Sequence, residues 1–304
     1  MKKHKIILLN NHEIDKTRWN AGIKNSNNPL IYAESWFLDV VTPNWKAVIS
    51  EDYSILWPLT INRKLLIPLI VQPMFTQQLG IFSAKIQDEK TLNQFYKTNP
   101  YPILTLQSNS AINHLNFYKK KENYILPLNK DYTTIKQSFN KNCKRNLKKA
   151  ELESQNCHYT NDSQFFIDFV RRHNSYQLPE KHINILKRII DLSLKKNCGF
   201  IIETKNISGE TLACAFFLKK HGRITFLSGN SSERGFNLKS MFLIINTVIK
   251  DYANSENTLD FEGSSIKGVA RFYKGFGAIT EYYNYRQHPI IECVQKAKRI
   301  FIRK

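Results

Sequence analysis

The sequence predicts a fold of the α/β (α+β) class, in which mixed sheets are covered by packed helices. Two observations in the second part of the chain support this prediction. Three apolar segments, at 199–204, 211–219 and 223–228, have strand character and are separated by turn sequences, as antiparallel strands are. A helical periodicity follows them and leads to a strand, a short helix and a last strand, an order that requires a mixed sheet with helices against it.

The first part of the chain predicts a mixture of helices and short strands. Trp19 and Ile23 recur at helical spacing, and a second helix is expected over 35–41. Two short strands are expected after them, and a structured loop follows because its sequence has neither helical nor strand periodicity. These elements cover 47–50, 55–60 and 73–80.

The second part predicts longer helices. Asp131 and Thr133 can cap a helix over 133–150, because their side-chain oxygens accept hydrogen bonds from the first backbone N–H groups. Pro179 stands near the start of a later helix, where proline is tolerated. The other expected elements are strands at 124–128, 258–262 and 278–285 and helices at 163–172, 180–196, 238–253 and 269–275.

Length and charge restrict the class of protein. A chain of 304 residues allows two domains, and we predict a boundary between 1–124 and 125–304. Hydrophobic residues make up 42% and charged residues 23%, as in a folded protein. The net charge of +20 favours polyanionic partners, among them tRNA, anionic lipid and coenzyme A. A lysine-rich but merely soluble surface is the alternative.

Cysteine and histidine usage predicts that the protein holds no metal. The five cysteines never form a CxxC pair and the eight histidines have no metal-ligand spacing, which argues against a disulfide framework or a zinc site. Neither a signal-peptide core nor a membrane span is recognisable, so we expect a cytoplasmic protein. The basic run at 293–304 contains apolar residues and is expected either to contact a membrane surface peripherally or to be a frayed helix.

Several short motifs resemble the GNAT acyltransferase superfamily. They read FNK…RNLKKA within 139–150, FLSGN at 226–230, LDFEGS at 259–264 and ARFYKGFGA at 270–278. Together they are similar to the Fem-type branch, with weaker support from SWF at 35–37 and FTQQLG at 75–80. This resemblance implies two GNAT-like domains in tandem: 1–124 on the acceptor side, degenerate, and 125–304 as the better preserved acyltransferase domain. It also implies an N-acyltransferase that uses acyl-CoA as co-substrate and an amine, small or peptidic, as acceptor.

The sequence departs from ordinary GNAT enzymes at the loop that grips coenzyme A. Their loop reads Gln/Arg-x-x-Gly-x-Gly/Ala, and its backbone N–H groups at a helix start bind the phosphates. Here the corresponding stretch 231–240 reads SSERGFNLKS, with Gly235 as its one glycine. In the Fem-type branch such degeneration accompanies aminoacyl-tRNA donors, so the donor stays open between a thioester and an aminoacyl-tRNA.

Tyr273 and Glu262 are the predicted catalytic residues. The resemblance gives Tyr273 the position from which a tyrosine protonates the leaving thiolate, and a phenol with a pKa of about 10 keeps its proton at neutral pH. The alternative is a tyrosine that packs its helix onto the sheet. Glu262 and Asp260 share one side of a predicted strand, where Glu262 could act as a general base. Alternatively, one of these carboxylates caps a turn or pairs with Arg271.

Two further groups of residues are predicted to bind the donor. Backbone N–H groups at the strand end formed by Ser228, Gly229 and Asn230 could hold the acyl carbonyl, unless this is an ordinary turn. Cations recur at offsets 0, 3, 4, 7 and 8 of one predicted helix and share one face, either for a polyanion or for solvent. The face comprises Lys141, Lys144, Arg145, Lys148 and Lys149, and the first four are the predicted donor-binding residues.

Gln77 and Gln78 are the predicted acceptor-binding residues, because amides both donate and accept hydrogen bonds. Buried, mutually satisfied glutamines are the alternative. The sequence thus predicts an acyltransferase acting on an amine. Aminoacyl-tRNA-dependent peptidyl transfer of the cell-wall type and a non-catalytic polyanion-binding protein on the same fold are the competing hypotheses, and no DNA partner is expected.

Overall fold

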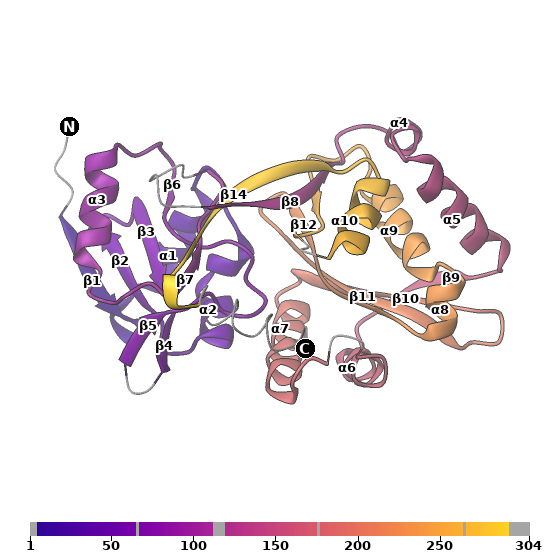
Figure 1. Cartoon of the computed structure of the whole chain (residues 1–304), viewed down its shortest axis with the longest axis horizontal. Helices are drawn as coiled ribbons and strands as arrows, with labels where there is room; N and C mark the ends of the chain where they lie inside the picture. Colours follow the sequence, from indigo (N-terminus) through magenta and orange to yellow (C-terminus); the bar gives the residue numbers. More distant parts are fainter. Residues whose placement is uncertain (1–4, 65–66, 112–118, 175–176, 264–265, 292–304) are drawn as a thin grey trace. The chain divides into compact units, whose positions relative to one another are not determined.

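The computed structural model describes residues 5–64, 67–111, 119–174, 177–263 and 266–291. They form two compact units. Unit 1 contains the described residues up to Lys121 and those from Tyr282 onward, and unit 2 is Glu122–Glu281. The chain enters unit 2 along β8 (Lys119–Pro127) and leaves it along β14 (Ile279–Gln287) (Figure 1). The predicted domain boundary at 124/125, the degeneracy of the first half and its acceptor role stay predictions, and the run 293–304 lies outside the described residues.

Unit 1 is built around a small antiparallel sheet with the strand order β1-β2-β3-β6. Trp19 and Trp57 are fully buried in this unit. A second hairpin pairs β4 with β5, and β7 pairs with the end of β14. The helices are α1 (Lys16–Lys24), α2 (Ser35–Val41) and α3 (Glu89–Thr98). The strands are β1 (Ile6–Asn10), β2 (Lys46–Ser50), β3 (Ile55–Leu59), β4 (Ile61–Lys64), β5 (Ile67–Ile70), β6 (Phe82–Ser83) and β7 (Thr105–Gln107).

Unit 2 is a mixed sheet with the strand order β8-β13-β12-β11-β10-β9, which confirms the predicted mixed α/β class. Only β12 and β13 run parallel among these described pairs. The strands after β8 are β9 (Asn156–Thr160), β10 (Gly199–Lys205), β11 (Thr211–Lys220), β12 (Arg223–Ser231) and β13 (Thr258–Asp260). The helices are α4 (Tyr132–Gln137), α5 (Lys141–Leu152), α6 (Ser163–Arg172), α7 (Glu180–Lys195), α8 (Glu233–Asn237), α9 (Ser240–Asp251) and α10 (Lys267–Gly275).

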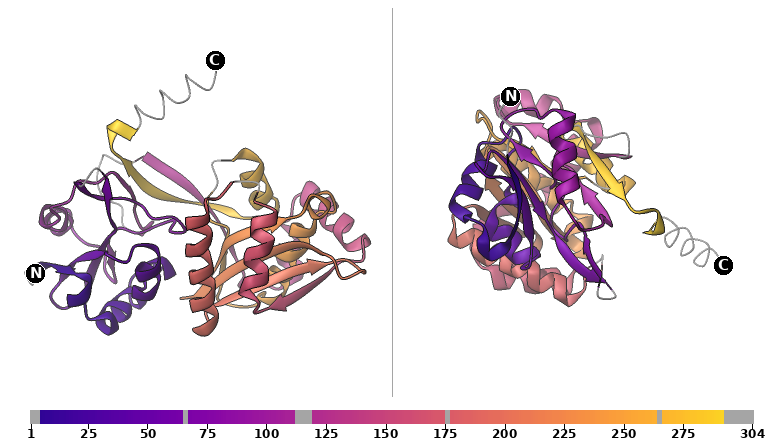
Figure 2. Two further views of the ribbon diagram at one scale, coloured as in Figure 1. Left: turned by 90° about the horizontal axis from the view of Figure 1, so that it is seen from below. Right: turned by 90° about the vertical axis from the view of Figure 1, so that its left-hand side faces the viewer.

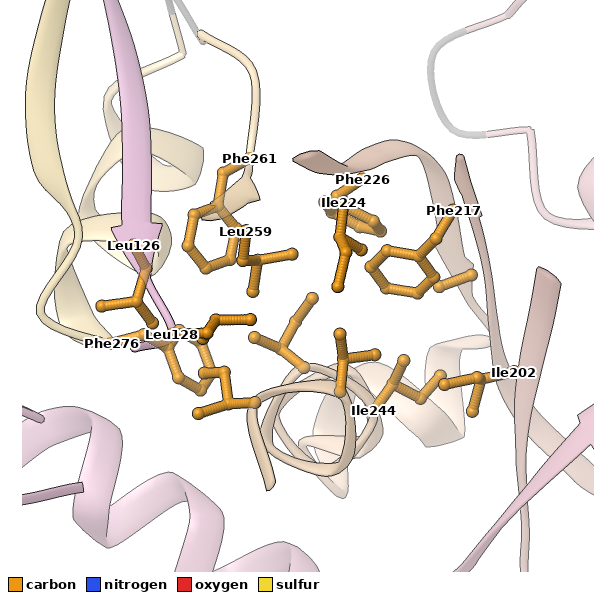
Figure 3. Close-up of a cluster of buried hydrophobic side chains, with 14 of the residues drawn as sticks. Leu126, Leu128, Ile202, Phe217, Ile224, Phe226, Ile244, Leu259, Phe261 and Phe276 are labelled. Carbon is orange, nitrogen blue, oxygen red and sulfur yellow. The ribbon is translucent and has the colours of Figure 1, made fainter. Parts of the chain in front are cut away.

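The core of unit 2 lies between α9 and the sheet. Figure 3 shows Ile244 of α9 opposite Leu259, Ile224 and Phe217 of three strands. Phe216, the neighbour of Phe217, points to the other face of the sheet, where its ring lies 6.2 Å from that of Phe166 in α6. Helices α6 and α7 therefore cover one face of the sheet, and α9, with α5 outside it, covers the other (Figures 1 and 2).

Several predicted elements have different bounds in the structure. The helix expected over 133–150 is two helices, because Asn140 accepts the N–H of Cys143 at 2.8 Å and starts a new one. The helix expected over 238–253 begins at Ser240, after Lys239 in the left-handed conformation. The strand expected at 258–262 ends at Asp260. Within the described residues, no helix combines the length and the apolar character needed to cross a bilayer.

Candidate active site

Strand β12 loses its parallel neighbour β13 after the first third of its length. Among the described residues β12 pairs with β13 only over Arg223–Thr225, although it continues to Ser231 alongside β11. The register with β11 also shifts, so that Leu227 is the extra residue of a β-bulge. The predicted donor-binding segment, Ser228 to Asn230, therefore lies beyond the point where β13 stops pairing. Such a strand edge offers backbone N–H groups that a neighbouring strand would otherwise occupy.

Gly229 is required by the crowding of this segment. A Cβ atom at this position would lie 2.4 Å from Cζ of Phe226 and 3.1 Å from Cε of Met241. The Phe226 ring and the first turn of α9 thus approach the bare backbone of β12. A side chain at position 229 would force both to move, so that only glycine allows this close packing.

Tyr273 lies against the same phenylalanine. From α10 its ring stacks on Phe261 at 5.0 Å between centroids and meets the edge of Phe226 at 6.3 Å. The Tyr124 ring is 6.1 Å away. Tyr273 is half-buried and packs α10 onto the strands. This is the packing role that the sequence offered as the alternative to catalysis. Phe226 in turn contacts the segment around Gly229, so one ring connects this segment with Tyr273.

Glu262 is placed by its neighbours in sequence. It follows Phe261, the residue that stacks on Tyr273, and has a left-handed backbone with φ of 59°. Its N–H donates to Oδ1 of Asp260 at 2.8 Å, so Asp260 caps this turn. Phe226 and Phe261 thus connect the strand segment, Tyr273 and Glu262 in one region of unit 2. The catalytic roles of Tyr273 and Glu262 stay predictions.

Arg223 is the ion-pair partner of Asp260. The sequence had offered Arg271 as a partner for Asp260 or Glu262. Nη1 of Arg223 lies 2.6 Å from Oδ2 of Asp260, whose side chain is 1% exposed, and its Nη2 lies 3.6 Å from Glu281. Glu281 also accepts a hydrogen bond from Asn123 at 3.0 Å. This ionic network joins four strands at the place where β12 leaves β13. Arg223 was missed because its carboxylate partner is far away in sequence.

Lys274, the neighbour of Tyr273 in sequence, extends toward Glu122. Its Nζ lies 3.8 Å from Glu122 and 5.0 Å from the centre of the Tyr124 ring, and the Tyr124 hydroxyl donates to the same carboxylate. Tyr273 and Lys274 therefore both lie near the Tyr124 ring, and Lys274 also reaches the Glu122 carboxylate.

The stretch in the place of a coenzyme A loop is helical. Ser232 caps α8 by accepting the N–H of Gly235 at 3.0 Å, and the N–H groups of Phe236 and Leu238 donate to carbonyls within the same stretch. Three backbone N–H groups that an open loop would offer to phosphates therefore already have acceptors within the protein.

The four predicted donor-binding cations of α5 are not brought to the strand segment. Lys141, Lys144, Arg145 and Lys148 are exposed, whereas Cys143, on the opposite side of α5, is buried. Helix α9 lies between α5 and the sheet (Figure 1), and the exposed cations lie on the side of α5 opposite the buried Cys143. Their donor role stays a prediction. Burial raises the pKa of the Cys143 thiol to about 12, so this thiol keeps its proton and is a poor nucleophile.

Gln77 and Gln78 are buried in unit 1. Nε2 of Gln78 donates to Oε1 of Gln77 at 3.0 Å, and Oε1 of Gln78 accepts the N–H of Ser110 at 2.8 Å. Gln78 is thus engaged within the protein, as the alternative of satisfied glutamines predicted. The acceptor-binding role of both residues stays a prediction. Among the described residues, no group of three or more His, Cys, Asp or Glu side chains is arranged to hold a metal ion.

Solved structures show which fold this is. No protein-family model matches the sequence, and no curated protein is similar to it. The structure of FemX superposes with a TM-score of 0.67 at 11% identity, over 92% of this chain and 96% of that one. L-PGS from Bacillus licheniformis gives 0.55 at 12% identity, over 95% and 97%. The C-terminal domain of a putative lysylphosphatidylglycerol synthetase from Agrobacterium fabrum gives 0.54 at 11% identity, over 94% and 95%.

These similarities extend over nearly the whole chain but at very low sequence identity, so they establish the fold alone. The predicted resemblance is confirmed at this level: the chain has a GNAT-like fold of the Fem type.

Proposed function

We propose that this protein transfers an acyl group from an activated donor to an amine. The observation that carries the proposal is the separation of β12 from β13, which leaves the segment Ser228–Asn230 beside Phe226 and Tyr273. A strand edge of this kind can bind the acyl group through backbone hydrogen bonds. The shared fold with FemX and L-PGS supports the same class of reaction by analogy.

In the proposed reaction the amine nitrogen attacks the acyl carbonyl carbon, and backbone N–H groups of β12 hold the resulting oxyanion. The C–N bond forms and the bond from the carbonyl carbon to the sulfur or oxygen of the donor breaks. Glu262 accepts the proton that the amine loses, and the Tyr273 hydroxyl gives its proton to the leaving thiolate or alkoxide. Solvent then restores both groups to their starting protonation states.

An acyl-CoA thioester is the first candidate donor, and an aminoacyl-tRNA is the second. The helical form of α8 favours the second, because the N–H groups of Gly235, Phe236 and Leu238 already have acceptors within the protein. A donor bound through its acyl end at β12 does not need a phosphate loop at α8. Acceptors to be tested are small amines and the amino groups of short peptides.

A thermal-shift titration separates the donors. Because a ligand that binds only the folded state raises the melting temperature, acetyl-CoA should produce a saturable rise if the donor is a thioester. A stable aminoacyl-tRNA analogue should do so if the donor is an ester, and uncharged tRNA is the control for binding without the acyl end. If no activated acyl compound shifts the melting temperature, a non-catalytic binding protein becomes the better description.

Tyr273→Phe is expected to lower kcat by about 100-fold, because it removes the proton donor for the leaving group. The ring contacts with Phe261 and Phe226 are retained, so the packing of α10 onto the strands should persist. Steady-state kinetics with the donor identified above tests this. Tyr282→Phe, at an exposed tyrosine, is the matched control. Equal activity of both variants would leave Tyr273 with a packing role alone.

Glu262→Gln is expected to lower kcat by about 10-fold or more at neutral pH, with less loss as the pH rises and more of the amine is already deprotonated. The backbone N–H bond to Asp260 is unaffected by the substitution, so the turn should persist. Glu256→Gln, at an exposed glutamate that precedes β13, is the control. A pH–rate profile identical to that of the unaltered protein would remove Glu262 from the mechanism.

A further inference from the structure

The outward face of α5 is a concentrated positive surface. Lys141, Lys144, Arg145, Lys148 and Lys149 are all exposed, and none forms an ion pair within the part of the chain that the structure describes. Lys144 donates to the carbonyl of Gln137, and Arg145 donates to the Asn142 amide. With Glu151 and Glu153 included, residues 141–153 still carry +3. Like charges one turn apart destabilise a helix, so an anionic partner would relieve this repulsion.

An exposed leucine continues this charged face. Leu152 is eleven residues after Lys141, which returns it to within about 20° of the same direction on an α-helix. Its side chain is 74% exposed at the end of α5. A basic helix face that ends in an exposed aliphatic side chain can bind anionic groups and also insert into an apolar phase. Helices that lie in a membrane interface have this character.

Two further apolar side chains protrude from the same end of unit 2. Ile207 is 90% exposed in the turn between β10 and β11, and Phe236 is 69% exposed on α8. Arg234 of α8 pairs with Glu210 of that turn at 2.6 Å. Gln155, just after α5, donates to the carbonyls of Ala150 and Leu238 and so ties α5 to the end of α8. Figures 1 and 2 show α5, α8 and this turn at one end of the unit.

We infer that this surface docks onto an anionic lipid bilayer. The bilayer face consists of the five cations of α5 with Leu152, Ile207 and Phe236. The cations match anionic headgroups, and the apolar side chains can enter the boundary between headgroups and acyl chains. A nucleic acid would satisfy the cations but would leave two aliphatic side chains in water, because leucine and isoleucine do not stack on bases. The inference does not depend on the proposed acyl transfer.

The test is co-sedimentation of the full chain with vesicles of equal parts phosphatidylglycerol and phosphatidylcholine, compared with phosphatidylcholine alone. Binding is expected to the first and not to the second, and to weaken as salt is added. A charge variant, Lys144→Gln with Arg145→Gln and Lys148→Gln, should bind about 100-fold more weakly, from the usual contribution of each cation near an anionic surface.

Two matched variants make the test specific. Lys24→Gln with Lys90→Gln and Lys97→Gln removes the same charge from exposed positions of unit 1 and should change binding less than about threefold. Leu152→Ser with Ile207→Ser and Phe236→Ser keeps the charge and should weaken binding about tenfold or more. Because all three apolar side chains are exposed, unfolding curves should confirm an intact fold.

Three results would overturn the inference. The first is no binding to the phosphatidylglycerol vesicles. The second is an equal loss in the unit 1 variant, which would mean that net charge alone attracts the protein. The third is unchanged vesicle binding in the apolar variant. Together with tight binding of tRNA in a filter assay, this third result would assign the α5 cations to a soluble polyanion instead.

Discussion

Gly235→Ala is expected to destabilise the protein by about 3 kcal/mol, at the upper end of the usual cost of overpacking. A Cβ atom on Gly235 would lie 1.9 Å from the carbonyl oxygen of Leu212 and 2.6 Å from its carbonyl carbon. Both are backbone atoms of β11, so they cannot turn aside as a side chain would. The first turn of α8 must therefore move away from the strand. This movement breaks the hydrogen bonds of the Ser232 hydroxyl, which accepts the N–H of Gly235 and donates to the carbonyl of Leu212. Urea unfolding followed by circular dichroism measures the change.

Gly268→Ala is the control for this substitution. Gly268 is also helical, in α10, but among the described residues beyond its chain neighbours and the backbone of α10 no heavy atom lies within 4 Å of the position that its Cβ would take. Alanine there should be neutral or stabilise by up to about 1 kcal/mol, through helix propensity. If Gly235→Ala and Gly268→Ala shifted the unfolding free energy equally, α8 would not pack against β11 as described.

Arg223→Met is expected to cost about 3–5 kcal/mol of the free energy of unfolding, the usual result of removing one partner of a buried ion pair. Arg223 is 14% exposed, and the Asp260 side chain with which it pairs is 1% exposed. The substitution leaves the Asp260 carboxylate buried without its counter-charge and removes the second interaction with Glu281. The loss reflects this uncompensated charge more than the attraction within the pair.

Arg234→Met provides the matched control. Its ion pair with Glu210 has the same 2.6 Å separation, but the two side chains are 59% and 46% exposed. Exposed pairs contribute about 1 kcal/mol or less, so this variant should unfold almost as the unaltered protein does. Combining Arg223→Met with Asp260→Asn should recover part of the loss. If the double variant were no more stable than Arg223→Met alone, burial of the unpaired carboxylate would not explain the cost.

The order of elements was predictable because local signals define it. The helix at Ser35–Val41 and the strands of unit 2 follow directly from periodicity and turn residues. The break between α4 and α5 was missed because the apolar spacing continues across it. Asn140, an N-cap residue three positions before Cys143, was the available signal.

The candidate site was only partly predictable. Tyr273 was identified by resemblance, and Glu262 and the segment around Gly229 from their places at strand ends. The sequence could not show that Phe226 and Phe261 connect them. Those contacts join α10, β12 and the turn after β13, and no periodicity reports contacts between distant segments. The Arg223–Asp260 pair was missed for the same reason, because 37 residues separate its partners.

The most direct test of the central claim is detection of the product. The purified protein is incubated with acyl-CoA thioesters or aminoacyl-tRNA together with a set of small amines and short peptides, and mass spectrometry is used to find new amides. The account predicts an amide that forms only with the protein present and that Tyr273→Phe reduces about 100-fold while Tyr282→Phe does not. A donor that binds saturably but yields no amide with any amine, or an amide formed equally by both variants, would contradict it.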